Sequence, residues 1–160
     1  QKIKKELNLS RPTEINEKDE EKIISYEFKN IFYKKLLWEI NQTYHHKIYT
    51  ATFMLVRKLF ENFLIDILRK NFKKEKELYI PTNNKKRYND FSVLLSNFSA
   101  KRSQFNFTTT EIDSITKSLK PYRIEANSKT HSIIEFGKKQ DLTKYKIQET
   151  FNLLERLWNN

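Results

Sequence analysis

The stretch Tyr49-Thr-Ala-Thr-Phe-Met-Leu-Val-Arg-Lys-Leu-Phe-Glu-Asn-Phe-Leu-Ile-Asp-Ile-Leu68 decides the fold of this chain. Its large apolar residues recur at intervals of three and four, which is the spacing of an amphipathic α-helix. Further apolar residues widen that face until most of the circumference is apolar: Ala51, Met54, Leu55, Leu59 and Leu64. A helix that is apolar nearly all round is buried within a helical bundle. We therefore predict a central helix over residues 48–72.

Helical patterns continue on both sides of this central segment. Apolar residues repeat at three and four from Glu21 to about Thr43, and a shorter pattern contains Phe91, Leu94, Leu95 and Phe98. Thr108 and Glu111 form a capping-box signature for a helix that should end before Pro121. Pro121 then begins a helix that should end at Gly137, and a final helix covers residues 142–158. The predicted fold is all-α, an antiparallel bundle of four to five helices.

The composition supports a packed helical domain. The chain has 160 residues, of which 38% are hydrophobic and 14% aromatic, so it can bury a sizeable core. It contains one glycine and three prolines, which is too few for a fold with many tight hairpins. Cysteine is absent, which excludes disulfides, zinc–thiolate sites and cysteine nucleophiles.

The predicted domain organisation is an N-terminal arm, residues 1–20, followed by one helical bundle, residues 21–160. The arm has mixed charges, few large apolar residues and Pro12. No apolar run approaches the ~20 residues that span a bilayer, and the N-terminus lacks a secretory signal, so we expect a cytoplasmic protein without a membrane partner. The first residue is Gln1 rather than Met, which indicates a segment of a longer polypeptide.

The net charge of +11 indicates attraction to nucleic acid or another polyanion. Several cations are candidate nucleic-acid contacts: Lys85, Lys86 and Arg87 in a predicted basic loop over residues 73–89, and Lys129 further along. The alternative is a Lys-rich composition of the kind that an AT-rich genome produces, with lysines that are simply solvated. The charge alone favours neither interpretation.

One polar stripe carries the most specific chemistry in the sequence. Arg123, Asn127 and His131 follow one another at a spacing of four, and each such step turns an α-helix by only ~40°. Arg binds phosphate through a fixed fork of donors, and His exchanges a proton near neutral pH. These groups suit metal-independent RNA cleavage, with His131 as acid or base, Arg123 on the phosphate and Asn127 as polar support.

Other chemistry is poorly supported by the sequence. A single glycine excludes a glycine-rich phosphate loop, and the three histidines form no metal-binding spacing, so we expect neither a cofactor nor a metal. Arg57 and Glu61 lie four apart on the polar side of the central helix, where an intrahelical ion pair explains them. The same pair could orient the stripe, and we expect it close by. Equally, the stripe could be a hydrogen-bonded seam between helices or protomers.

The segment Arg123-Ile-Glu-Ala-Asn127-Ser-Lys-Thr-His131 resembles the signature of HEPN-like helical domains, in a branch with Arg, Asn and His each four apart. The stretch Tyr49–Leu68, with its unit from Arg57 to Glu61, is similar to the central helix of that branch. The likeness covers roughly residues 30–158. It implies a four- or five-helix bundle, frequent homodimers, and a place in prokaryotic antiviral defence, toxin–antitoxin or restriction systems.

The resemblance also implies alternatives for activity. Many HEPN members are metal-independent endoribonucleases in which Arg and His from two protomers share one cleft, which assigns phosphate binding to Arg123 and acid–base chemistry to His131. Seven residues separate Arg123 from His131, more than the nuclease motif of the family usually has. Other members are inactive and serve as dimerisation, nucleotide-binding or partner-docking modules. Both a ribonuclease and a non-catalytic module of a larger defence protein therefore stay open.

Overall fold

The computed structural model describes residues 21–83, 86–132 and 134–159. The predicted arm, residues 1–20, lies outside the described residues. The described part is helical and contains no strand, so the predicted all-α class is confirmed. The elements in chain order are α1 (Ile31–His45), α2 (Tyr49–Asn71), the short 3-10 helix η2 (Lys76–Leu78), α3 (Phe91–Ala100), the 3-10 helix η3 (Arg102–Gln104), α4 (Thr109–His131), α5 (Lys139–Thr143) and α6 (Ile147–Asn159).

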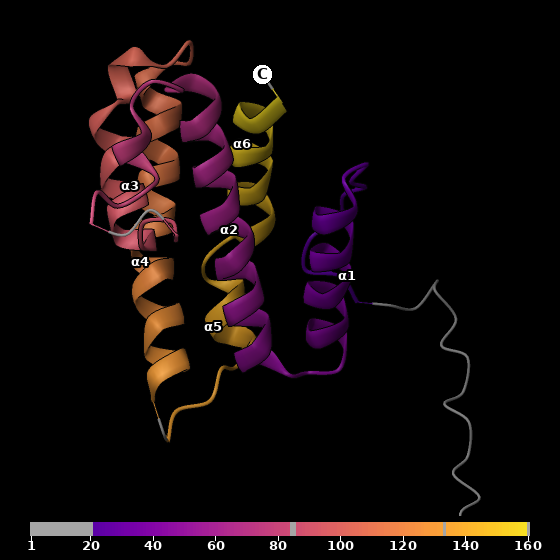
Figure 1. Ribbon diagram of the computed structural model, residues 1–160. Helices are drawn as coiled ribbons and strands as arrows, with labels where there is room; N and C mark the ends of the chain where they lie inside the picture. The colour runs from indigo at the N-terminus through magenta and orange to yellow at the C-terminus, as the bar shows by residue number, and fades with distance from the viewer. Residues whose placement is uncertain (1–20, 84–85, 133, 160) are drawn as a thin grey trace, which may run out of the picture.

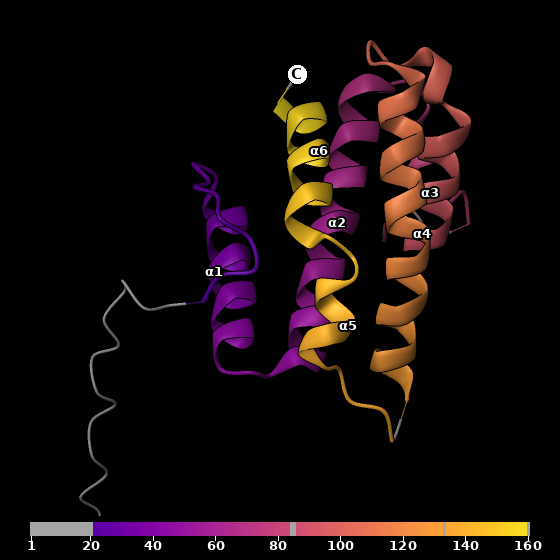
Figure 2. The same cartoon turned by 180° about the vertical axis from the view of Figure 1, so that it is seen from behind.

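Helix α2 is the centre of the bundle, as its sequence predicts. It contacts α1 on one side, α3 and α4 on the other, and α5 and α6 behind (Figures 1 and 2). Most large apolar side chains along it are buried, among them Phe53, Phe60 and Phe63, whereas Met54 is 46% exposed. Each buried side chain of this size contributes roughly 1.5–3 kcal/mol through removal from water. The fold is therefore organised around α2.

Residues 21–30 are not helical, although their apolar spacing predicts a helix from Glu21. Helix α1 begins only at Ile31, where the side chain of Asn30 accepts a hydrogen bond from the backbone N–H of Tyr33. The preceding segment is held by Asn41, whose Oδ1 accepts from Ile23 N and Ile24 N at 3.1 and 3.2 Å. Asn41 Nδ2 donates to Ile24 O at 2.9 Å. The side-chain amide of Asn41 thus supplies backbone hydrogen bonds to residues 23 and 24 that a helix would otherwise provide.

Helix α4 is continuous through Pro121, whereas the sequence predicts two helices that meet there. Its predicted cap is confirmed: Thr108 Oγ1 accepts from Glu111 N at 3.3 Å. A proline inside a helix removes one hydrogen bond and costs roughly 3 kcal/mol. Burial of its neighbours Leu119 and Tyr122 offsets that cost, and the Tyr122 hydroxyl donates to Phe53 O at 2.7 Å. Packing against α2 thus overrides the local preference of proline.

Gly137 does not cap the helix that carries the stripe, because α4 ends at His131. The glycine instead lies where the following loop passes close to the start of α2. A Cβ atom at Gly137 would be 2.9 Å from Thr50 N and 3.0 Å from the Phe53 ring. The Gly137 N–H donates to Thr50 Oγ1 at 2.9 Å. Close approach, rather than a special backbone angle, requires glycine here.

The predicted final helix is interrupted. Helices α5 and α6 are separated at residues 144–146, where Lys146 has a φ of 47°. A non-glycine residue in the left-handed region ends a helix, and the sequence gives no glycine or proline as a signal. Across the described residues, no helix is long and apolar enough to cross a membrane.

Candidate functional site

The three residues of the polar stripe all lie on the C-terminal half of α4. Their rotation about the helix axis, ~40° per step, directs them to different surroundings. Asn127 faces α2, Arg123 lines a groove between α3 and α4, and His131 is exposed as the last residue of the helix. The stripe is thus helical, as predicted, but it does not converge on one closed pocket.

The spacing also fixes distances along the helix. A rise of 1.5 Å per residue separates Asn127 from His131 by ~6 Å, and Arg123 from His131 by ~12 Å. Neighbouring members of the stripe are therefore about one helical turn apart, and its two end members are about two turns apart.

Arg57 and Glu61 of α2 support Asn127. The Arg57 guanidinium donates through Nε and Nη2 to Glu61 Oε1, both at 3.1 Å, so the predicted intrahelical ion pair is present. Its Nη1 atom also donates to Asn127 Oδ1, which places Arg57 beside the stripe. The side chains of Arg57 and Glu61 are 23% and 26% exposed.

This contact fixes the orientation of the Asn127 amide. Arg57 can only donate hydrogen bonds, so the amide oxygen must face it and the NH2 group must face away. Among the described residues, that NH2 group has no hydrogen-bond partner. The Asn127 amide therefore offers two donors, directed away from Arg57, that no described residue uses.

The positive charge of Arg57 is neutralised by the carboxylate of Glu61. Burial raises the pKa of the Glu61 carboxyl, the nearby Arg57 guanidinium opposes that rise, and Asp90 adds to it. Asp90 is the residue that precedes α3, so Glu61 lies at the junction of α2 and α3. Arg57 thus acts as a support within the protein, while Arg123 and His131 have no hydrogen bond or ion pair with any described residue.

The four candidate nucleic-acid contacts differ in their placement and exposure. Lys85 lies outside the described residues, and Lys86 and Arg87 are exposed in the connector before α3. Lys129 is only 11% exposed and lies 3.4–3.7 Å from the carboxylates of Glu125, Glu135 and Asp141. These carboxylates already neutralise its ammonium group, so Lys129 ties α4 to the following loop and α5. It is a poor candidate for a phosphate contact.

The structure adds residues that the sequence analysis did not select. The groove beside Arg123 contains three serines of α3 and two further cations, Arg102 and Lys120. The serines, Ser92, Ser96 and Ser99, recur at four and three, which is a helical spacing. That signal was visible in the sequence, but it lies between the apolar residues that define the buried face of α3.

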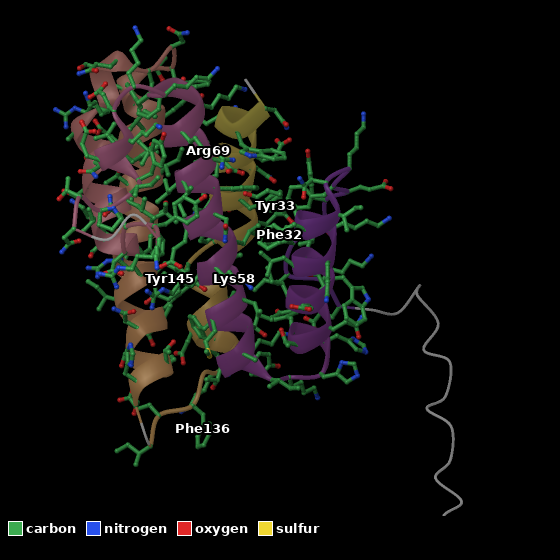
Figure 3. The ribbon with its side chains drawn as sticks, in the orientation of Figure 1. Phe32, Tyr33, Lys58, Arg69, Phe136 and Tyr145 are labelled. Carbon is green, nitrogen blue, oxygen red and sulfur yellow. The ribbon has the colours of Figure 1, made fainter. Side chains whose placement is uncertain are left out.

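Three exposed apolar side chains lie on the C-terminal half of α4 and on the loop that follows it. Ile124 of α4 is 60% exposed, and Ile134 and Phe136 of the following loop are 85% and 75% exposed. Phe136 lies at the far end of the bundle from α3, on the loop that leaves α4 (Figure 3). Among the described residues, no group of three His, Asp or Glu side chains could hold a metal ion.

Comparison with protein-family models, curated protein sequences and solved structures found no match for this chain. The likeness to HEPN domains therefore depends on the residues quoted from the sequence.

Proposed function

We propose that this chain is an HEPN-like RNA-binding domain of a prokaryotic defence or toxin system, and that it cleaves RNA without a metal ion. The single observation that carries the proposal is the row of free donors on α4. The contact with Arg57 turns the Asn127 NH2 group away from that guanidinium, and neither this group nor the side chains of Arg123 and His131 have a hydrogen-bond partner among the described residues. Open donors beside a fixed support suit a phosphate chain.

The reaction class follows from the groups in the row. The RNA 2′-hydroxyl attacks the adjacent phosphorus, the bond from phosphorus to the 5′-oxygen breaks, and a 2′,3′-cyclic phosphate and a 5′-hydroxyl result. His131 either removes the 2′-hydroxyl proton or donates a proton to the leaving oxygen, and water takes up or supplies the other proton. Asn127, ~6 Å from His131 along the helix, donates to the same phosphate. Arg123 binds a neighbouring phosphate, or the phosphate at the site of a second copy.

The test is cleavage of single-stranded RNA in the presence of a chelator. We expect a 2′,3′-cyclic phosphate product, and His131→Ala should lower the rate ~10²- to 10⁴-fold, the usual contribution of a general acid or base. His46→Ala is the matched control, because His46 is an exposed histidine that follows α1. Cleavage that persists in His131→Ala, or that the chelator abolishes, would end the proposal.

A second candidate is a dimerisation or partner-docking module, and the exposed apolar residues favour it. Ile124, Ile134 and Phe136 flank the stripe on α4 and its following loop. A contact with another protein would remove these exposed apolar side chains from water. A pairing of two copies here would also bring two stripes together. Light scattering over a range of concentrations tests it: a chain that stays monomeric, with Phe136→Ser indistinguishable from the parent, would exclude the homodimer.

A further inference from the structure

We propose that the groove between α3 and α4 binds the phosphate backbone of a single-stranded RNA, as the continuation of the strand that contacts Arg123. The inference rests on the RNA binding proposed above and adds where the strand runs. The groove is lined by three hydroxyl groups, three cations and three apolar residues: Ser92, Ser96, Ser99, Arg102, Lys120, Arg123, Leu95, Ala100 and Ile124.

The polar groups in this groove are available to a ligand. The three serine hydroxyls make no hydrogen bond with any described residue, and the same holds for the Lys120 ammonium and the Arg123 guanidinium. Arg102 lies 3.7 Å from Asp113, but both side chains are more than half exposed, so this pair is weak. Serine hydroxyls and cations that face one groove are the donor set of a phosphate site.

The shape of the groove favours a strand over a small ligand. From Ser92 to Ser99 the hydroxyls extend over ~10 Å of helix, at 1.5 Å per residue. The cations come from α4 and from η3, so they lie along the groove rather than at one point. A row of donors of this length suits successive phosphates of a chain.

The width and chemistry indicate a single strand bound without base recognition. Packed helices lie only ~8–10 Å apart, so the surface groove along their contact is narrow and suits one phosphate backbone rather than a duplex. None of the described residues that line the groove is aromatic, so the groove offers no ring for base stacking of the kind found in many single-strand sites. Binding should therefore be tolerant of sequence and strongly dependent on salt.

The experiment measures the affinity of the full chain for a labelled RNA of about 12 nucleotides, a typical single-strand site size. The RNA carries 2′-O-methyl groups, so it cannot be cleaved by 2′-hydroxyl attack and binding is measured alone. Lys120→Glu should weaken binding about tenfold, as expected for reversal of a charge at a phosphate contact. The matched control is Lys117→Glu, which makes the same charge change at an exposed position of α4 outside the groove.

Each outcome decides the inference. A selective loss in Lys120→Glu, with oligo(U) and oligo(A) bound alike, supports it. Equal losses in both variants would show general charge attraction and overturn it, and so would absence of binding. A mononucleotide that competes as well as the strand would make the groove a nucleotide site instead, and equal competition by a hairpin duplex would exclude the single strand. Because the RNA cannot be cleaved, loss of the ribonuclease proposal through His131→Ala leaves this test unaffected.

Discussion

The region around Asp66 and the region around Arg123 differ in whether their polar side chains have hydrogen-bond partners within the protein. Asp66 of α2 accepts from the Tyr33 hydroxyl at 2.6 Å, from Trp158 Nε1 at 3.2 Å and from Arg69 Nη2 at 2.8 Å. Burial, and then the hydrogen bond to Asp66, raise the pKa of the Tyr33 hydroxyl well above its usual range. On α4, by contrast, Arg123 and His131 have no partner among the described residues.

This difference separates groups that hold the fold from groups that are free to bind. A buried polar group that loses its partner keeps its desolvation cost, so closed networks are required for stability. Donors at a surface cost nothing when left to water, and they remain open to a ligand. Stability measurements on the two halves should therefore differ sharply, and four predictions test the contrast.

The largest loss is expected for Asp66→Ala. The change leaves the Tyr33 hydroxyl and Trp158 Nε1 without their acceptor, and Tyr33 is only 4% exposed. We expect the free energy of unfolding in urea to fall by about 3 kcal/mol. Arg69→Ala is the control, because it removes only a cation that is 55% exposed and should cost less than about 1 kcal/mol. Similar losses in the two variants would contradict the network.

A second comparison uses two asparagines. Asn41→Ala leaves the backbone N–H groups of Ile23 and Ile24 without an acceptor and should cost about 2 kcal/mol. Asn127→Ala removes one contact from Arg57, which keeps Glu61, so the cost should be about 1 kcal/mol or less. Urea unfolding of both variants is the measurement. An equal loss for Asn127→Ala would identify the stripe as a structural seam rather than a binding site.

A smaller effect is expected at the loop that follows the site. Gly137→Ala places a methyl group 2.9 Å from the backbone of Thr50 and should destabilise the fold by about 1–2 kcal/mol through overpacking. The neighbouring Phe136 is 75% exposed, so Phe136→Ala is the control and should change stability by no more than about 0.5 kcal/mol. Thermal unfolding of both variants measures the difference. A neutral Gly137→Ala would show that the loop can move away from α2.

The sequence predicted the helices whose pattern and packing agree. The apolar circumference of α2 indicated its central place, and Thr108 with Glu111 marked the start of α4. It failed where tertiary contacts override a local signal. Asn41 replaces helical hydrogen bonds in residues 21–30, and burial of Tyr122 keeps α4 intact through Pro121. Neither contact can be read from neighbouring residues.

The candidate site was predictable only in part, for a similar reason. Helical spacing placed Arg123, Asn127 and His131 on one stripe, and the contact between Arg57 and Asn127 agrees with the expected proximity of α2. The groove was missed because it depends on which faces of α3 and α4 meet. Ser96 and Lys120 are far apart in sequence and ordinary as surface residues. Their association is a property of packing, which spacing within one helix does not encode.

The smallest predicted effect concerns pH, and it compares two carboxyl groups with shifts of opposite sign. Burial raises the pKa of Glu61, so the native state holds its proton more tightly than the unfolded chain. The contribution of Glu61 to stability is therefore present below pH ~4.5 and is lost as the pH rises through its raised value. At the exposed Glu21 the hydrogen bond from Lys139 lowers the pKa, so its contribution is present above pH ~4.5 and is lost as the pH falls.

Urea unfolding between pH 3 and 7, a range of about four units around the ordinary carboxyl pKa, tests this pair of signs. As the pH rises, the free energy of unfolding of the parent chain should fall relative to that of Glu61→Gln. For Glu21→Gln the opposite is expected: the free energy of unfolding of the parent chain should rise relative to that of the variant as the pH rises. Parallel pH profiles for the two variants would mean that Glu61 is solvated like a surface carboxylate. The ion pair of Glu61 with Arg57, which also contacts Asn127, would then contribute as little to stability as a surface pair.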